Sequence, residues 1–302
     1  MSRLTQGYII AIIGIAVWST TGIFIDYLVT HYHMPALLLA LWRNVLVCVA
    51  LVPALFFLRR SLLYIERSQL GFHIFYGFVL AVFNSIWTLS VKANGAAVAT
   101  VLAYSSAGFT AILALWLFKE KLGLPKITAV ILSLGGCVLV SDAYRPEMWR
   151  LNPLAVSTGL LSGLLFAAYT LIGKEVARRN INAWTSLLYS FAFASIFIFI
   201  FNLFPTIPGA PGSYQELLPD LPVTGWIDLI ILSFIPTLLG FGLYNLSMNY
   251  LPASITNLLA TLEPAMTAAE AYIFLDERMT VIQILGGLII LSAVLIVQLE
   301  RE

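Results

Sequence analysis

Residues 96–122 read AAVATVLAYSSAGFTAILALWLFKEKL, and residues 253–279 read ASITNLLATLEPAMTAAEAYIFLDERM. The stretches lie 157 positions apart, seven of their 27 aligned positions are identical, and each closes on a charged triplet, Lys119-Glu120-Lys121 or Asp276-Glu277-Arg278. A composition rich in Ala and Leu raises the number of matches, but it does not explain why the charges fall at the same place. A fixed internal period indicates a duplicated unit. In a membrane protein, such a duplication is typical of transporters.

The composition is that of a chain solvated by lipid. Of the 302 residues, 60% are hydrophobic and 10% are charged, and the mean hydropathy is +0.94. A soluble domain carries about 25% charged residues. The net charge of +1 argues against nucleic acid as a partner. Both cysteines, Cys48 and Cys137, lie in apolar runs, which predicts buried thiols and no disulfide framework.

Apolar runs of membrane-spanning length recur along the whole chain. A helix that crosses the hydrocarbon core needs about 20 apolar residues. Such runs occupy residues 6–28, 35–58, 69–92, 94–117, 124–142, 153–174, 183–204, 224–249, 253–275 and 279–299. The first run is too long for a signal peptide and no small-x-small cleavage site follows it, so we expect it to stay as an anchor. The chain is therefore predicted to be an all-α integral membrane protein with ten transmembrane helices.

The distribution of Lys and Arg predicts the orientation. With the N-terminus in the cytoplasm, the inner segments hold eleven of these residues and the outer segments hold four. Cytoplasmic loops carry the excess of Lys and Arg. Both termini are therefore expected in the cytoplasm.

A duplicated unit of five helices has a consequence for topology. Because five is odd, the second copy enters the membrane from the opposite side, so the halves 1–148 and 149–302 are predicted to be two inverted five-helix repeats. Glu120 is then expected at the cytoplasmic face and Glu277 at the outer face. Inverted repeats are a recurrent architecture for alternating access, with the substrate near the midplane between the halves.

Short motifs stand at fixed places in both halves. The second half holds Tyr250-Leu251-Pro252-Ala253-Ser254, Leu262-Glu263-Pro264 and Asp276-Glu277-Arg278, and the first half holds Trp18-Ser19 and Lys119-Glu120-Lys121-Leu122. This pattern resembles the EamA-type transporters of the drug/metabolite transporter superfamily over nearly the whole chain. The resemblance implies ten helices in two inverted repeats, a bacterial inner (cytoplasmic) membrane, and transport of small organic molecules, commonly the export of amino acids or related metabolites.

Three ionisable residues lie within predicted spans, namely Arg43, Glu263 and Glu270. An ionised group at a helix centre costs roughly 2.5–3.5 kcal/mol on insertion scales, so each is a candidate for function. Glu263 lies near mid-span, and Pro264 beside it cannot donate a hydrogen bond to the carbonyl of Ala260. A carboxyl group beside an opened backbone suits an ammonium group or a proton, and a structural hydrogen bond at a helix kink is the alternative.

The other two charges suggest a gate. Arg43 and Glu270 are both expected in the outer half of the membrane, where an ion pair between them would lower the cost of both and act as an external latch. The first repeat holds Ser105-Ser106-Ala107 where the second holds Leu262-Glu263-Pro264. No symmetric pair of carboxylates is therefore expected.

Aromatic and amide side chains are further candidates for substrate binding. They are Trp18, Asn84, Trp87, Tyr104, Tyr169, Tyr244 and Asn245. An aromatic-lined cavity suits an apolar or aromatic side chain and offers a ring face to a cation. Trp87 and Tyr244 correspond under the shift of 157 positions, but both lie near helix ends, where an interfacial aromatic belt is the alternative. Trp18, Tyr104 and Tyr169 lie deeper and are favoured as cavity lining.

These features together predict a secondary transporter that exports amino acids or related small metabolites by alternating access. Its expected partners are a small-molecule substrate and the lipid bilayer, and the oligomeric state stays open, with a monomer compatible. Alternatives are a proton-coupled transporter of multiple drugs or quaternary ammonium compounds, a nucleoside-type metabolite transporter of the same fold, and a non-transport membrane subunit. The sequence has no Gly-rich phosphate loop with Lys and no HExxH motif, so neither a cofactor nor a metal is predicted, and an enzyme is not expected.

Overall fold

Apolar helices make up the regular structure. A computed structural model describes residues 2–94, 96–148, 153–211, 216–275 and 280–299, and within these ranges every regular element is helical. The helices are α1 (Arg3–Trp18), α2 (Thr21–Thr30), α3 (Ala36–Leu58), η1 (Arg60–Leu63), α4 (Arg67–Asn94), α5 (Ala96–Ala103), α6 (Ser106–Phe118), α7 (Leu124–Val140), η2 (Pro146–Met148), α8 (Pro153–Arg178), α9 (Ala183–Asn202), α10 (Val223–Leu232), η4 (Ser233–Gly240), α11 (Phe241–Ser247), α12 (Ala253–Ala260), α13 (Glu263–Leu275) and α14 (Val281–Leu299). The prediction of an all-helical chain is confirmed for this part of the sequence.

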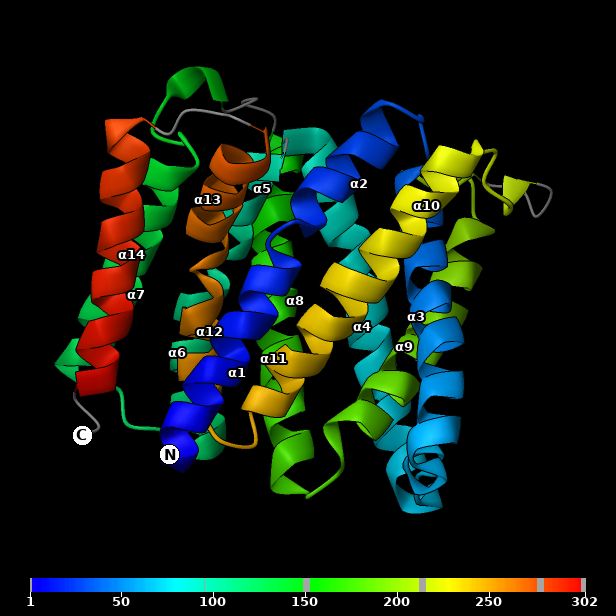
Figure 1. The fold of residues 1–302 in the computed structure, drawn as a ribbon, viewed down its shortest axis with the longest axis horizontal. Helices are drawn as coiled ribbons and strands as arrows, with labels where there is room; N and C mark the ends of the chain where they lie inside the picture. The colour runs from blue at the N-terminus through cyan, green and yellow to red at the C-terminus, as the bar shows by residue number, and fades with distance from the viewer. Residues whose placement is uncertain (1, 95, 149–152, 212–215, 276–279, 300–302) are drawn as a thin grey trace.

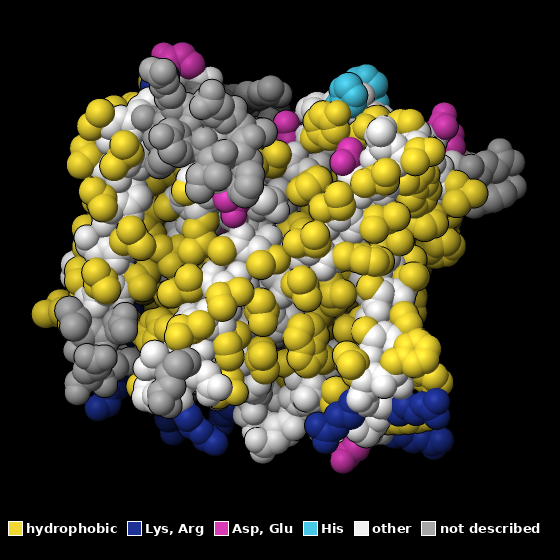
Figure 2. Space-filling model, viewed as in Figure 1, with side chains coloured by type: hydrophobic (Ala, Val, Ile, Leu, Met, Phe, Trp, Pro, Cys, Tyr) yellow, Lys and Arg dark blue, Asp and Glu magenta, His cyan; other side chains and the backbone are white. Residues whose placement is uncertain are grey.

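The helices have the length and surface of membrane spans. Among the residues that the structure describes, seven helical stretches are long and apolar enough to cross a bilayer: Arg3–Thr30, Ala36–Leu58, Arg67–Asn94, Val98–Phe118, Ala155–Arg178, Ala183–Asn202 and Val223–Ser247. Leu124–Val140 and Val281–Val297 are shorter apolar helices. Large apolar side chains face outward, with Phe57 83% and Trp116 80% exposed. Figure 2 shows hydrophobic side chains over much of the visible face between the two ends of the bundle, a surface suited to lipid.

The two ends of the bundle carry different charges. In Figure 2, Lys and Arg gather at the lower end, whereas His and most of the visible Asp and Glu lie at the upper end. We call the lower end the basic end. Figure 1 shows that α1 begins and α14 ends there. The chain thus enters and leaves the bundle on the same side.

Two long helices break at corresponding positions. The pair α5/α6 is interrupted at Tyr104 and Ser105, and α12/α13 is interrupted at Thr261 and Leu262, which are the same positions after the shift of 157. In Figure 1, α5 lies above α6 but α13 lies above α12, so the two broken helices run in opposite directions.

The two breaks have different local causes. Pro264 occupies the first turn of α13, where its missing N–H is not needed, so its ring favours a new helix start there. The first repeat has no proline at this place. The Ser105 hydroxyl instead donates to the carbonyl of Leu102 at 2.7 Å, which competes with the regular helical bonding.

A close crossing of two helices, α7 and α14, depends on two glycines. A Cβ added to Gly136 would lie 2.8 Å from the carbonyl oxygen of Gly286, and a Cβ added to Gly286 would lie 2.9 Å from that of Gly136. The neighbouring Gly135 has no atom within 4 Å of its ideal Cβ position. Small residues at helix interfaces allow such close approach in lipid.

We expect the substitution Gly136→Val to destabilise the protein by about 1–3 kcal/mol, because backbone atoms cannot move aside for the added side chain. Thermal denaturation of the purified protein in detergent measures the effect. Gly135→Val is the matched control on the open side of the same helix, and it should leave the melting temperature unchanged. Equal losses in the two variants would contradict the role of the crossing.

Candidate functional site

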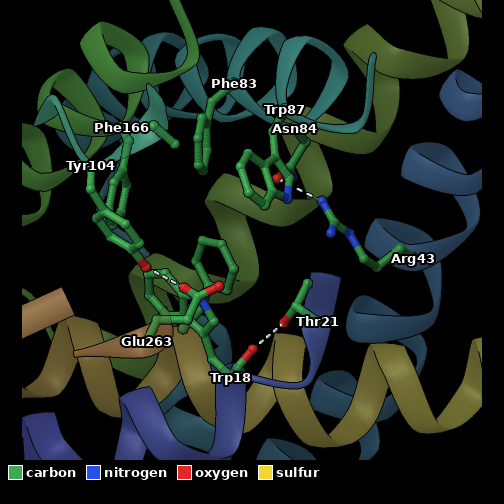
Figure 3. A pocket seen from close by; sticks show the side chains of 11 residues that line it. Trp18, Thr21, Arg43, Phe83, Asn84, Trp87, Tyr104, Phe166 and Glu263 are labelled. Carbon is green, nitrogen blue, oxygen red and sulfur yellow. Dashed lines mark hydrogen bonds between the residues drawn. The ribbon is translucent and has the colours of Figure 1, made fainter. Parts of the chain in front are cut away.

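One pocket is surrounded by side chains from both halves of the chain (Figure 3). Its lining residues are Trp18, Thr21, Arg43, Phe83, Asn84, Trp87, Ala103, Tyr104, Phe166, Phe241 and Glu263. The empty space between them is about 420 Å³, part of which opens to solvent. Three of these residues stand beside helix breaks: Trp18 ends α1, Tyr104 follows α5 and Glu263 begins α13. The breaks in three helices therefore meet at this pocket.

Apolar rings form most of the pocket wall. Trp18 stacks on Phe241 with ring centroids 5.2 Å apart, and Phe83 stacks on Phe166 at 5.4 Å. The π-helix η4 brings Gly240 against Trp18, where an added Cβ would lie 2.5 Å from the Trp18 Cβ. These contacts fix the rings around the pocket. The three phenylalanines carry no sequence signal that separates them from the many other apolar residues of their helices.

Glu263 forms the acidic pole of the pocket. Its side chain is 4% exposed, and one carboxylate oxygen accepts a hydrogen bond from the Tyr104 hydroxyl (Figure 3). The Trp18 side chain also interacts with the carboxylate. The Thr267 hydroxyl lies within hydrogen-bond distance of the carbonyl oxygens of Ser19 and Glu263, at 2.8 and 3.0 Å. Glu263 therefore connects the broken helix of the second half to both broken helices of the first.

Arg43 forms the basic pole. The side chain is 1% exposed, and its Nη2 donates to Oδ1 of Asn84 at 2.8 Å. Asn84 is held in turn by Asn44, which accepts from its Nδ2 at 3.1 Å, and Asn44 donates to the carbonyl of Ala40 at 2.6 Å. The Nε of Arg43 is buried and has no hydrogen-bond partner in the part of the chain that the structure describes. None of the ion pairs found among the described residues includes Arg43.

The predicted ion pair between Arg43 and Glu270 is not formed in this structure. Glu270 instead accepts a hydrogen bond from the Ser19 hydroxyl at 2.6 Å, at the break between α1 and α2, and it does not line the pocket. The guanidinium group of Arg43 donates a hydrogen bond to Asn84. The two charges thus have different neighbours, and only Arg43 faces the pocket.

The remaining candidates divide into two groups. Asn84 and Trp87 line the pocket, and Trp87 is 9% exposed, so its ring faces the protein interior. Tyr169, Tyr244 and Asn245 do not line it. Tyr244 lies behind the wall, with its ring 5.3 Å from Trp18, and Asn245 donates to the Tyr169 hydroxyl at 2.6 Å. The three form a buried polar layer that supports the pocket.

At the basic end of the bundle, a cluster of polar contacts joins the two halves. Oε1 of Glu120 accepts from the backbone N–H of Ala253 at 2.9 Å, and Oε2 accepts from the Ser254 hydroxyl. Lys126 lies 3.5 Å from Oε2 of Glu120 and donates to Ser254 at 2.9 Å. We call Glu120, Lys126, Ala253 and Ser254 the basic-end latch. A carboxylate at the start of α12 satisfies a free backbone N–H group and the positive end of the helix.

Of the two aligned glutamates, Glu120 and Glu277, the structure describes only Glu120. Glu120 follows α6 and lies in the basic-end latch. Its counterpart Glu277 lies outside the described residues, so its predicted position at the outer face stays a prediction.

Comparisons with known proteins agree with this architecture. The sequence profile of the EamA-like transporter family matches residues 5–142 and, a second time, residues 153–299. An uncharacterized transporter of Archaeoglobus fulgidus is 27% identical over 76% of this chain and 76% of its own length. Probable amino-acid metabolite efflux pumps of Escherichia coli and Salmonella typhimurium are 24% and 25% identical, over 95% and 98% of this chain and 93% and 95% of their own lengths.

A protein of known crystal structure has a similar fold. It superposes with a TM-score of 0.78 over 98% of this chain and 97% of its own length, at 15% sequence identity. At this identity the similarity speaks for the fold alone.

Proposed function

Because the chain belongs to the EamA-like transporter family, we propose that it is a secondary transporter that exports amino acids or related small metabolites across the cytoplasmic membrane. The observation that carries the proposal is the pocket between the halves, with a buried Glu263, a buried Arg43 and a wall of aromatic rings. A mostly apolar pocket with a few convergent polar groups is typical of small-molecule sites. Two relatives named as probable amino-acid metabolite efflux pumps support the substrate class.

The proposed architecture is ten crossings in two inverted repeats, residues 1–148 and 149–302. Two separate matches to the family profile support the division. The opposite directions of the broken helices α5/α6 and α12/α13 support the inversion (Figure 1). The gathering of Lys and Arg supports a basic end that faces the cytoplasm together with both termini.

The proposed mechanism is a rocking of the two halves about the pocket. In the present conformation the basic-end latch holds Glu120 of the first half against the start of α12 in the second. Entry of solute from the cytoplasm into the pocket requires these contacts to separate. Rigid halves that alternate about a midplane site are the usual form of transport by inverted repeats.

Counterflow in proteoliposomes tests the proposal. We expect unlabelled amino acid inside the vesicles to accelerate the entry of the same labelled amino acid, because only a carrier exchanges solute across both faces. Vesicles without protein are the control. Entry that does not respond to internal solute would indicate a channel, and no entry of any amino acid would contradict the substrate class.

A second candidate function is proton-coupled export of quaternary ammonium compounds. The observation that favours it is the acidic pole at Glu263, which lies among aromatic rings that suit a cation. The same counterflow assay with labelled tetraethylammonium or choline separates the two. A response to these cations but to no amino acid would favour the second function.

A further inference from the structure

We infer that the transported solute carries a carboxylate group and that Arg43 binds it. The inference rests on the proposed function of the pocket and adds the chemical group that the site recognises. It is carried by Arg43 itself, a buried arginine that lines the pocket and has no acidic partner among the residues described.

The hydrogen bonding of Arg43 is incomplete. A guanidinium group has five N–H donors and is always charged. Here the described residues provide one hydrogen bond, from Nη2 to Asn84, and Nε is buried without a partner. Burial of an uncompensated charge is unfavourable, and its usual solution in proteins is a carboxylate. The missing partner is therefore expected from the solute.

Arg43 is also fixed in position before a solute arrives. The chain of amides from Ala40 through Asn44 to Asn84 directs the Asn84 carbonyl oxygen at Nη2. Asn84 thus acts as a positioning residue for the guanidinium fork. A fixed planar fork binds a carboxylate through two parallel hydrogen bonds, which lysine cannot reproduce.

The opposite pole restricts which carboxylates fit. Figure 3 shows Arg43 and Glu263 on different sides of the pocket, with aromatic rings between them. A solute with two negative groups would meet the Glu263 carboxyl group, whereas a zwitterion with an apolar side chain would not be repelled. Such a pair of poles selects by repulsion as well as by attraction.

The first test does not depend on the identity of the solute. The melting temperature of the purified protein is measured in sodium acetate and in sodium chloride at equal ionic strength. We expect acetate to raise it in the wild type and not in Arg43→Gln, with a smaller rise in Arg43→Lys. Arg145→Gln, which removes an exposed charge outside the pocket, should respond like the wild type.

The second test compares matched solutes. L-Leucine and L-phenylalanine are compared with their amides and with 3-methylbutylamine and 2-phenylethylamine in competition for binding to the wild type. We expect the acids to bind about tenfold or more tightly, a difference of about 1.4 kcal/mol. In Arg43→Gln this preference should disappear.

The outcomes separate this inference from the proposed function. A response to acetate that requires Arg43, without binding of any amino acid, would keep the carboxylate site and overturn the amino-acid assignment. Amino acids that bind no better than their amides, or an acetate effect of the same size in Arg43→Gln, would overturn the inference and leave transport standing. If Arg43→Gln does not fold, the wild-type comparison alone decides, because equal binding of acids, amides and amines refutes a carboxylate site.

Discussion

If transport is coupled to protons through Glu263, replacing Glu263 with glutamine is expected to abolish solute movement driven by a pH gradient in proteoliposomes, while counterflow of the same solute continues. Glutamine keeps the size of the side chain and an oxygen that can accept the bond from Tyr104, but it cannot take up or release a proton. Counterflow needs no net proton movement. The variant therefore separates proton coupling from the transport cycle itself.

A matched control is available on the same helix. Glu270 is a half-buried carboxyl group of α13 that accepts a hydrogen bond from Ser19 and does not line the pocket. Glu270→Gln should keep pH-driven movement. If Glu263→Gln shows the same pH dependence as the wild type, Glu263 has no coupling role. If counterflow is also lost, its carboxylate is needed to bind the solute.

Much of the helical frame is predictable from the sequence because it follows from local chemistry. Long apolar runs give helices of membrane length, as in α3, α4 and α9. The helix break before Glu263 follows from the ring of Pro264. The corresponding break at Tyr104 has no proline and is not evident from its own residues. It becomes predictable only through its alignment with the second repeat.

The composition of the site is less predictable because burial within a helix does not tell which neighbour a side chain meets. Trp18, Tyr104 and Glu263 stand out by type and depth, and all three line the pocket. Tyr244 is also a fully buried tyrosine, but its hydroxyl lies 2.8 Å from that of Thr170 and its ring lies behind the pocket wall. The partner of Arg43 could not be predicted from the sequence either, because its guanidinium group donates to an amide on α4 and not to a carboxylate on α13.

Removing the carboxylate of Glu120 is expected to open the basic end. In Glu120→Ala, the N–H of Ala253 loses its acceptor and Lys126 loses its carboxylate partner. Loss of a side chain that caps a helix costs about 0.5–2 kcal/mol. Because one or two kcal/mol changes an equilibrium about 5- to 30-fold, the conformation closed at this end should lose population by a factor of this order.

The accessibility of the pocket measures that shift. Thr21, which lines the pocket, is replaced by cysteine in a background where the two free cysteines, Cys48 and Cys137, are changed to alanine. A membrane-impermeant thiol reagent is then applied to either face of sealed vesicles. Glu120→Ala should increase labelling from the basic end, and Glu120→Gln should have a smaller effect, since the amide oxygen still accepts from Ala253.

The duplicated sequence makes the test directional. Glu277 aligns with Glu120, so Glu277→Ala is predicted to shift the equilibrium the other way and to increase labelling from the opposite face. A general loss of stability would raise labelling from both faces in both variants. Opposite effects of two aligned glutamates are expected only if the halves act as inverted copies, because an inverted pair exchanges the two faces of the membrane. If both variants open the pocket to the same face, alternating access by inverted halves is refuted for this protein.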